Sequence, residues 1–114
     1  VTIGYGLRNL ASMEDGLSEI TLVLKPGGRL VILDFGTPAN HLIRSVYFLY
    51  LAGLLPVIGW LCCGNVSAYA YLLKSLNKYT AQKGVTSVLR FMGYTSVQVI
   101  ELMAGSMSIH IAVK

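Results

Sequence analysis

The sequence predicts an α/β fold in which a helix joins two parallel strands, and further helices and an antiparallel hairpin follow. Three observations carry this prediction. A β-prone run at residues 1–3 and an unbroken apolar run at residues 30–33 flank a helical pattern. A Pro-Gly-Gly turn at residues 26–28 ends that helix. From Met107 to Val113 apolar residues alternate with other residues, which is the period of a strand.

The composition restricts the class of protein. The 114 residues suffice for one modest core, yet 54% are hydrophobic and only 12% are charged, against roughly 25% charged in an average soluble domain. We therefore expect lipid, a partner or another part of the same protein to cover apolar surface. The basic residues behind the net charge of +4 are scattered, so no nucleic-acid partner is expected. The adjacent Cys62 and Cys63 predict two buried, reduced thiols and no metal site.

The first third of the chain contains a clear helix. Ser12 is a good N-cap, and acidic residues in the first turn complement the helix dipole. Apolar residues then recur at helical spacing at Leu17, Ile20 and Leu24.

Two chain segments are candidates for ligand contact. The run at 30–33 does not alternate, which predicts a strand covered on both faces, and Asp34 stands at its end. In open parallel sheets, ligands bind at the carboxyl ends of strands. Gly4 and Tyr5 follow the first strand, where glycine lets a ligand approach the backbone; an ordinary strand-to-helix turn is the alternative.

The middle of the chain is unusually apolar, with no charged residue from Val46 to Cys63. This length is at the lower limit for a membrane span. Because Pro56 interrupts the segment, we expect an apolar helical insertion at 40–66, made of two buried or lipid-facing helices split at Pro56. A true membrane span is the alternative.

The last part of the chain predicts two helices and a hairpin. The first helix runs from Ala68 to about Lys78 with Ser67 as its cap, and the second occupies residues 81–92. Strands at 96–103 and 107–113 flank a turn at 104–106. His110 is expected to be a hydrogen-bonded sheet residue.

Several segments resemble the UbiE-type quinone-biosynthesis methyltransferases, which methylate demethylmenaquinol or 2-polyprenyl-benzoquinol. The sequence reads G-Y-G-L-R-N at residues 4–9, V-L-K-P-G-G-R at 23–29 and L-D-F at 33–35. A tyrosine-containing segment, S-A-Y-A-Y-L, follows at 67–72, with Ser75 beyond it. L-K-P-G-G recurs across class I methyltransferases, whereas the upstream G-L-R-N is more specific. The resemblance covers essentially the whole chain and fits menaquinone and ubiquinone precursors alike.

The resemblance implies that residues 1–114 form the C-terminal half of a class I methyltransferase, a Rossmann-like sheet. The glycine-rich half that binds most of the cofactor is missing here. This half should therefore be inactive alone, require its N-terminal half, and expose the flank of its first strand as a raw sheet edge.

The resemblance also implies an activity and a site. Methyl transfer from S-adenosyl-L-methionine to a ring carbon of a prenylated quinol would use Gly4 and Tyr5 for cofactor contact, although many relatives carry Ser at the Gly4 position. Arg8 would be the catalytic cation beside the phenolate. Asp34 would hold Arg8 or a water that takes the phenol proton. The substrate side would include Asn9, Tyr69 and Tyr71.

The implied location is cytoplasmic, with peripheral contact at the inner membrane where the apolar insertion covers the prenyl tail. Two other classes stay open at this point. One is a truncated, non-catalytic half-domain that binds lipid or a partner. The other is a small membrane-anchored protein.

Overall fold

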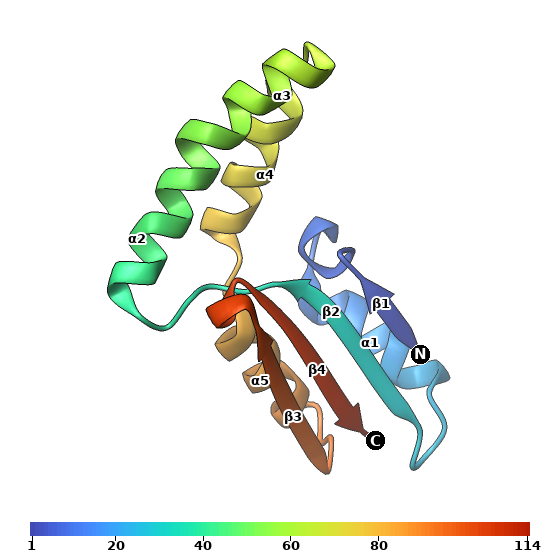
Figure 1. Cartoon of the computed structure of the whole chain (residues 1–114). Coiled ribbons are helices and arrows are strands. Elements are labelled where there is room, and N and C mark those ends of the chain that lie inside the picture. The colour runs from blue at the N-terminus through green and yellow to red at the C-terminus, as the bar shows by residue number, and fades with distance from the viewer. The chain divides into compact units, whose positions relative to one another are not determined.

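A computed structural model describes all 114 residues, which form two compact units. The first unit comprises residues 1–37 and 80–114, and the second comprises residues 38–79. The elements of the first unit are β1 (Thr2–Gly4), η1 (Leu7–Asn9), α1 (Met13–Val23), β2 (Arg29–Phe35), α5 (Ala81–Phe91), β3 (Ser96–Leu102), η3 (Met103–Gly105) and β4 (Met107–Val113) (Figure 1). Those of the second unit are α2 (His41–Leu49), the π-helical turn η2 (Tyr50–Leu54), α3 (Leu55–Cys63) and α4 (Ser67–Lys78).

The first unit is built on a mixed sheet with strand order β1-β2-β4-β3. The β1 and β2 strands are parallel, whereas β4 is antiparallel to both β2 and β3. The predicted α/β fold, with two parallel strands and a closing hairpin, is therefore confirmed. The short β1 strand is an edge of the sheet, as expected from the sequence.

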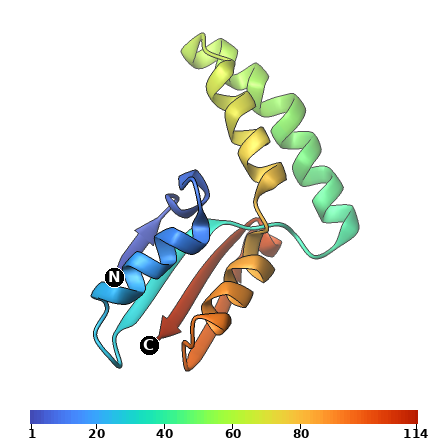
Figure 2. The ribbon, with the colours of Figure 1, turned by 180° about the vertical axis from the view of Figure 1, so that it is seen from behind.

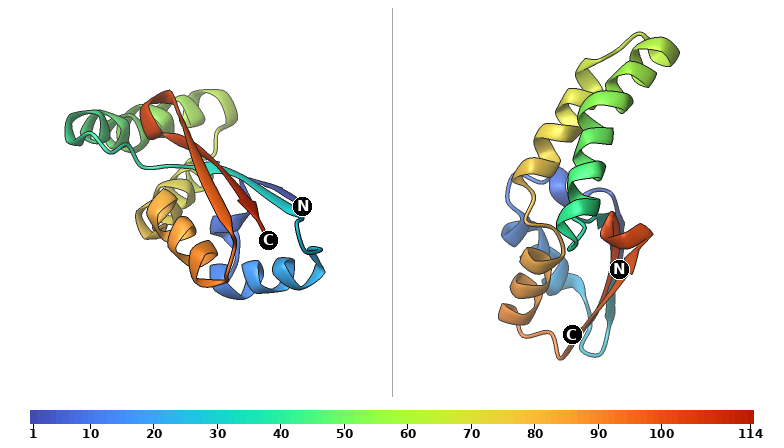
Figure 3. Two further views of the ribbon diagram at one scale, coloured as in Figure 1. Left: turned by 90° about the horizontal axis from the view of Figure 1, so that it is seen from below. Right: turned by 60° about the vertical axis from the view of Figure 1, so that its left-hand side comes forward.

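Helices α1 and α5 lie on the same face of this sheet (Figures 2 and 3). On that face Leu30, Ile32 and Asp34 of β2 are fully buried. The intervening Val31 and Leu33 point to the other face and are only half-buried. The prediction that both faces of this strand are covered is wrong for this unit, because both of its long helices pack on one side.

Capping and turn residues in the local sequence determine where α1 begins and ends. The Asp15 amide donates to the Ser12 hydroxyl at 3.2 Å, so Ser12 caps α1 as predicted. After the helix, Gly27 adopts a φ of 76°, which favours glycine, and its amide donates to the Lys114 carbonyl at 2.8 Å. The Pro-Gly-Gly turn thereby joins the start of β2 to the end of β4.

The second unit is a helical hairpin, and its first arm is one continuous helix. Helices α2, η2 and α3 run from His41 to Cys63 without a break, and α4 returns beside them (Figure 1; Figure 3, right). The predicted split at Pro56 is wrong. Pro56 has no N–H to donate within a regular helix, and the chain accommodates it with a π turn in which the Leu55 amide donates to the Tyr50 carbonyl.

Most of this hairpin's apolar surface is exposed. The helix from His41 to Cys63 is long and apolar enough to cross a membrane, with a mean hydropathy of 2.0. Only 11% of its most apolar 18-residue stretch is buried. Cys62 and Cys63 are exposed, so the prediction of buried thiols is wrong. These residues stand at the end of α3, where the hairpin has no further layer to cover them.

The two arms of the hairpin meet closely at one glycine. Gly59 of α3 is buried, and a Cβ atom there would collide with the ring of Tyr69 of α4. The Asn65 side chain accepts from the Ser67 amide at 3.0 Å, so Asn65 satisfies the start of α4 in place of the predicted cap Ser67. The hairpin is thus fixed by an Asn turn and by a glycine-aromatic contact.

Two glycines in the same arm give a matched test of this packing. We expect Gly59→Ala to lower the free energy of unfolding by about 1–3 kcal/mol, because the new methyl group overlaps the Tyr69 ring. Gly53→Ala should be neutral or stabilise by up to about 1 kcal/mol, because nothing lies within 4 Å of the added Cβ. Denaturant unfolding of the full-length protein measures both, and equal effects would contradict the contact.

Candidate active site

The site forms where β1 and β2 reach their carboxyl ends. After Gly4, Tyr5 adopts a left-handed φ of 54°, and its amide donates to the Leu33 carbonyl of β2 at 2.8 Å. The chain then enters η1, whose Leu7 is 1% exposed and anchors the turn in the core. The Asn9 side-chain amide donates to the Tyr5 carbonyl at 3.2 Å. A left-handed non-glycine residue is costly, so this turn is held by specific contacts.

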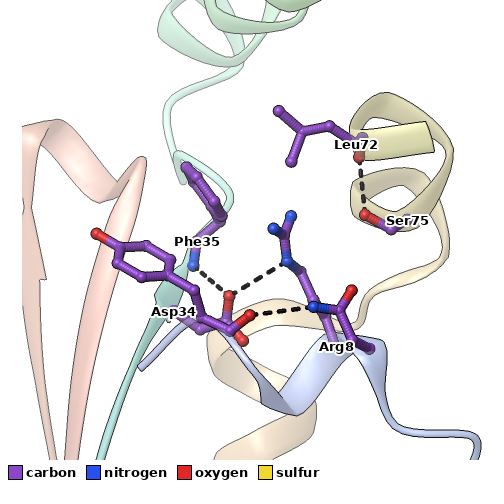
Figure 4. A network of polar contacts seen from close by, with 7 residues as sticks. Arg8, Asp34, Phe35, Leu72 and Ser75 are labelled. Atoms are coloured by element: carbon purple, nitrogen blue, oxygen red, sulfur yellow. Dashed lines mark hydrogen bonds and ion pairs between the residues drawn. The ribbon is translucent and has the colours of Figure 1, made fainter. Parts of the chain in front are cut away.

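Arg8 lies between an acid and an aromatic ring. Its Nε is 3.7 Å from Asp34 Oδ1, and the two side chains are 11% and 1% exposed (Figure 4). Its Cζ stands 4.7 Å from the centroid of the Phe35 ring. The Phe35 amide also donates to Asp34 Oδ1 at 2.8 Å. In Figure 4 the terminal nitrogens of Arg8 point away from the Asp34 carboxylate, so the acid engages only the Nε side of the guanidinium.

Tyr5 completes this group by packing against Phe35, with ring centroids 5.1 Å apart and planes tilted by 52°. Phe35 therefore has Tyr5 as a neighbouring ring and the Arg8 cation over its face. A cation over an aromatic face is attracted to the ring quadrupole, and more strongly where water is excluded. This contact and the Asp34 ion pair together orient the Arg8 side chain.

Burial dominates the titration of Asp34. Removal of the carboxyl from water raises its pKa above the usual 3.8, and the Phe35 amide and Arg8 only partly oppose this effect. The long Nε–Oδ1 distance agrees with that order of effects, because a 3.7 Å ion pair stabilises the carboxylate less than a direct charged hydrogen bond.

His110 lies on the same buried face of the sheet, two residues along β4 from Ser108, which pairs with Asp34. Its Nε2 is 3.3 Å from the Gln82 carbonyl, which fits the expectation of a hydrogen-bonded sheet histidine, while Nδ1 has no hydrogen-bond partner. Burial lowers the pKa of His110 below the usual 6.5, against the opposing influence of the Gln82 carbonyl and Asp34.

The sequence reasoning missed Gln82. This residue is 9% exposed at the start of α5 and joins three segments of the first unit. Its Oε1 accepts from the Thr37 amide at 3.0 Å, and its Nε2 donates to the Gly105 carbonyl at 3.1 Å. A signal was present, because Gln82 falls on the same helical face as Val85 and Leu89, where a polar residue is unusual.

The structure brings together four of the predicted site residues, namely Tyr5, Arg8, Asn9 and Asp34. Gly4 is exposed at the end of β1, and nothing lies within 4 Å of a Cβ built on it, so the strand end is open there. The two tyrosines belong to α4 in the second unit. Tyr69 packs on Gly59, whereas Tyr71 is 60% exposed. In the same helix the Ser75 hydroxyl donates to the Leu72 carbonyl at 2.8 Å (Figure 4).

Comparison with known proteins places this chain in a family. The sequence profile of the ubiE/COQ5 methyltransferase family matches residues 1–114. The chain belongs to the ubiE/COQ5 methyltransferase family. It is 43% identical over 114 residues to a demethylmenaquinone methyltransferase of Clavibacter sepedonicus. This alignment covers all of the present chain and 46% of the relative.

Other relatives agree with this assignment. Identity is 37% to the demethylmenaquinone methyltransferase of Mycolicibacterium gilvum and 34% to the ubiquinone/menaquinone biosynthesis C-methyltransferase UbiE of Stutzerimonas stutzeri. The whole chain is covered in both cases, together with 50% and 44% of the respective relatives. The chain thus spans about half the length of the curated relatives that it matches.

The buried histidine predicts a pH dependence of stability. Because the pKa of His110 is lower in the folded state, the unfolded state binds more protons just below pH 6.5. We expect the stabilising effect of neutral His110 to be complete above about pH 6.5 and to be lost as the pH falls toward the folded-state pKa.

Denaturant unfolding of the full-length protein between pH 5 and 7.5 measures this effect. In His110→Gln the decrease in the free energy of unfolding below pH 6.5 should disappear, whereas the variant of the exposed His41, His41→Gln, should retain it. A loss of the same size in all three proteins would show that His110 is not its source.

Proposed function

We propose that the protein containing this chain transfers a methyl group from S-adenosylmethionine to a ring carbon of a prenylated quinol, in menaquinone or ubiquinone biosynthesis. The observation that carries the proposal is Arg8, oriented by Asp34 and Phe35 at the carboxyl ends of two parallel strands. Family membership and the names of the relatives support the reaction class. The proposal concerns the longer protein, because the chain spans about half of those relatives.

The open end of β1 fits a cofactor that approaches the backbone. Gly4 offers no side chain, and no atom lies within 4 Å of the position that its Cβ would occupy. Gly4 and Tyr5 would therefore contact S-adenosylmethionine through main-chain atoms, and the remaining contacts would come from the other half of the protein. When bound, this cofactor supplies an electrophilic methyl group on a sulfonium.

Arg8 would act on the acceptor. A quinol ring carbon becomes a strong nucleophile when a neighbouring phenol loses its proton, and a fixed cation stabilises the resulting phenolate. A guanidinium N–H of Arg8 would donate to the phenolate oxygen, while Asp34 holds the side chain from its Nε side. Asn9 would keep the turn in place through its hydrogen bond to Tyr5, and Tyr69 and Tyr71 would line the substrate.

The lipid solubility of the substrate bears on where the protein would act. A prenylated quinol resides in lipid, so the protein would be cytoplasmic with peripheral contact at the inner membrane. The exposed apolar surface of the helical hairpin supports this contact.

Replacement of Arg8 tests the proposal. We expect Arg8→Met in the full-length protein to lower kcat by about 10²–10³-fold, because the phenolate loses its fixed cation. The deficit should shrink as the pH rises toward about 10, where the phenol ionises unaided. Steady-state methyl transfer between pH 7 and 10 measures both effects, with thermal unfolding measured in parallel.

The exposed Arg90→Met on α5 is the matched control and should keep the activity and the pH profile of the unmodified protein. A deficit in Arg8→Met that stays constant at every pH would argue that Arg8 is only a structural ion-pair partner.

A further inference from the structure

We propose that the tip of the helical hairpin, residues 55–73, inserts into a single leaflet of an anionic lipid bilayer and stops at Lys74. This deepens the membrane contact in the proposed function, since it specifies the segment, the depth and the lipid charge.

The tip carries apolar side chains on its outer surface and no charge. Residues 45–73 contain no Asp, Glu, Lys or Arg. Both arms expose large apolar residues, with Trp60 62%, Leu61 69% and Tyr71 60% exposed. The same surface includes Val57, Ile58 and Val66. Exposed apolar side chains gathered at one end of a unit mark an interaction site, and a tyrosine close to the first lysine, here Tyr71, is typical of a bilayer interface.

The charge pattern of the unit indicates the chemistry of its partner. Residues 38–79 contain Arg44, Lys74 and Lys78 but no Asp or Glu, whereas all five acids of the chain lie in the first unit. Lys74 and Lys78 are exposed and one helical turn apart on α4. A cationic unit with an apolar tip complements an anionic headgroup layer above hydrocarbon.

The position of the two lysines limits the depth of insertion. Tyr69 packs on Gly59 in the antiparallel hairpin, so Lys74 falls at the level of Leu54 and Lys78 at the level of Tyr50. If the helix from His41 to Cys63 crossed the bilayer, both lysines would be carried to its centre, where charged side chains are rarely tolerated.

Insertion up to Lys74 avoids this burial. At a rise of about 1.5 Å per residue, the distance from the turn at Gly64 to Lys74 is about 10–15 Å. One leaflet of a hydrocarbon core of about 30 Å is about 15 Å thick. The uncharged tip therefore matches a leaflet in length, and the lysines would lie among the headgroups.

The two exposed cysteines at the tip provide a direct readout. The full-length protein is mixed with vesicles of phosphatidylcholine and phosphatidylglycerol, and a membrane-impermeant maleimide is added outside or trapped inside. Labelling at Cys62 and Cys63 is measured against a Cys62→Ser/Cys63→Ser variant. We expect rapid labelling without vesicles and at least tenfold slower labelling, from either side, with vesicles.

Three results would overturn the inference. Unchanged labelling of vesicle-bound protein would mean that the tip stays in water. Labelling by the trapped reagent would mean that the hairpin spans the bilayer. Protection without vesicles would mean that another part of the protein or a second copy covers the tip. None of these readouts involves methyl transfer, so they stand apart from the test of the catalytic proposal.

A matched pair of variants locates the contact. Leu61→Glu at the tip should weaken vesicle binding at least tenfold, because a charge replaces a lipid-facing leucine. Leu22→Glu on α1, with 73% exposure against 69% for Leu61, should leave binding unchanged. Lys74→Gln and Lys78→Gln should each weaken binding to anionic vesicles roughly fivefold and leave binding to neutral vesicles unaffected. Equal effects of the two glutamate variants would contradict the assignment.

Discussion

The buried carboxylate of Asp34 is the constraint on which the rest of the site depends. It lies in the covered face of the sheet at 1% exposure, where an unpaired charge is costly. Its contacts come from the Phe35 amide and from Arg8, which must therefore lie at the ends of β1 and β2. The left-handed Tyr5, the buried Leu7 and the Asn9 hydrogen bond all fix the turn that brings Arg8 there. One buried acid thus couples the fold to the placement of a cation.

The sequence predicted those features that local chemistry determines. Ser12 marked the start of α1, and the Pro-Gly-Gly turn marked its end. The alternation of apolar with other residues marked β4. Caps, turns and strand periods are all short-range properties of the sequence. Asp34 was singled out by its place at the end of an apolar strand and Arg8 by resemblance, and the structure places the two in contact. Their catalytic roles stay predictions.

The features that the sequence did not reveal depend on contacts between distant segments. Phe35 under Arg8 and Gln82 between Thr37 and Gly105 need the folded arrangement of the first unit. The π turn before Pro56 replaced an expected break, since a helix can absorb a missing N–H by shifting its hydrogen-bond register. Cys62 and Cys63 were expected to be buried, as free cysteines commonly are, yet both are exposed at the end of α3.

The central claim is that Asp34 acts through Arg8, and a double-mutant cycle tests it most directly. Arg8→Met, Asp34→Asn and the double variant of the full-length protein would be compared in kcat/KM. If Asp34 only positions Arg8, its replacement should cost little once Arg8 is gone, giving a coupling of about 1–3 kcal/mol. Additive losses from the two single variants would contradict the account, because each residue would then contribute independently of the other.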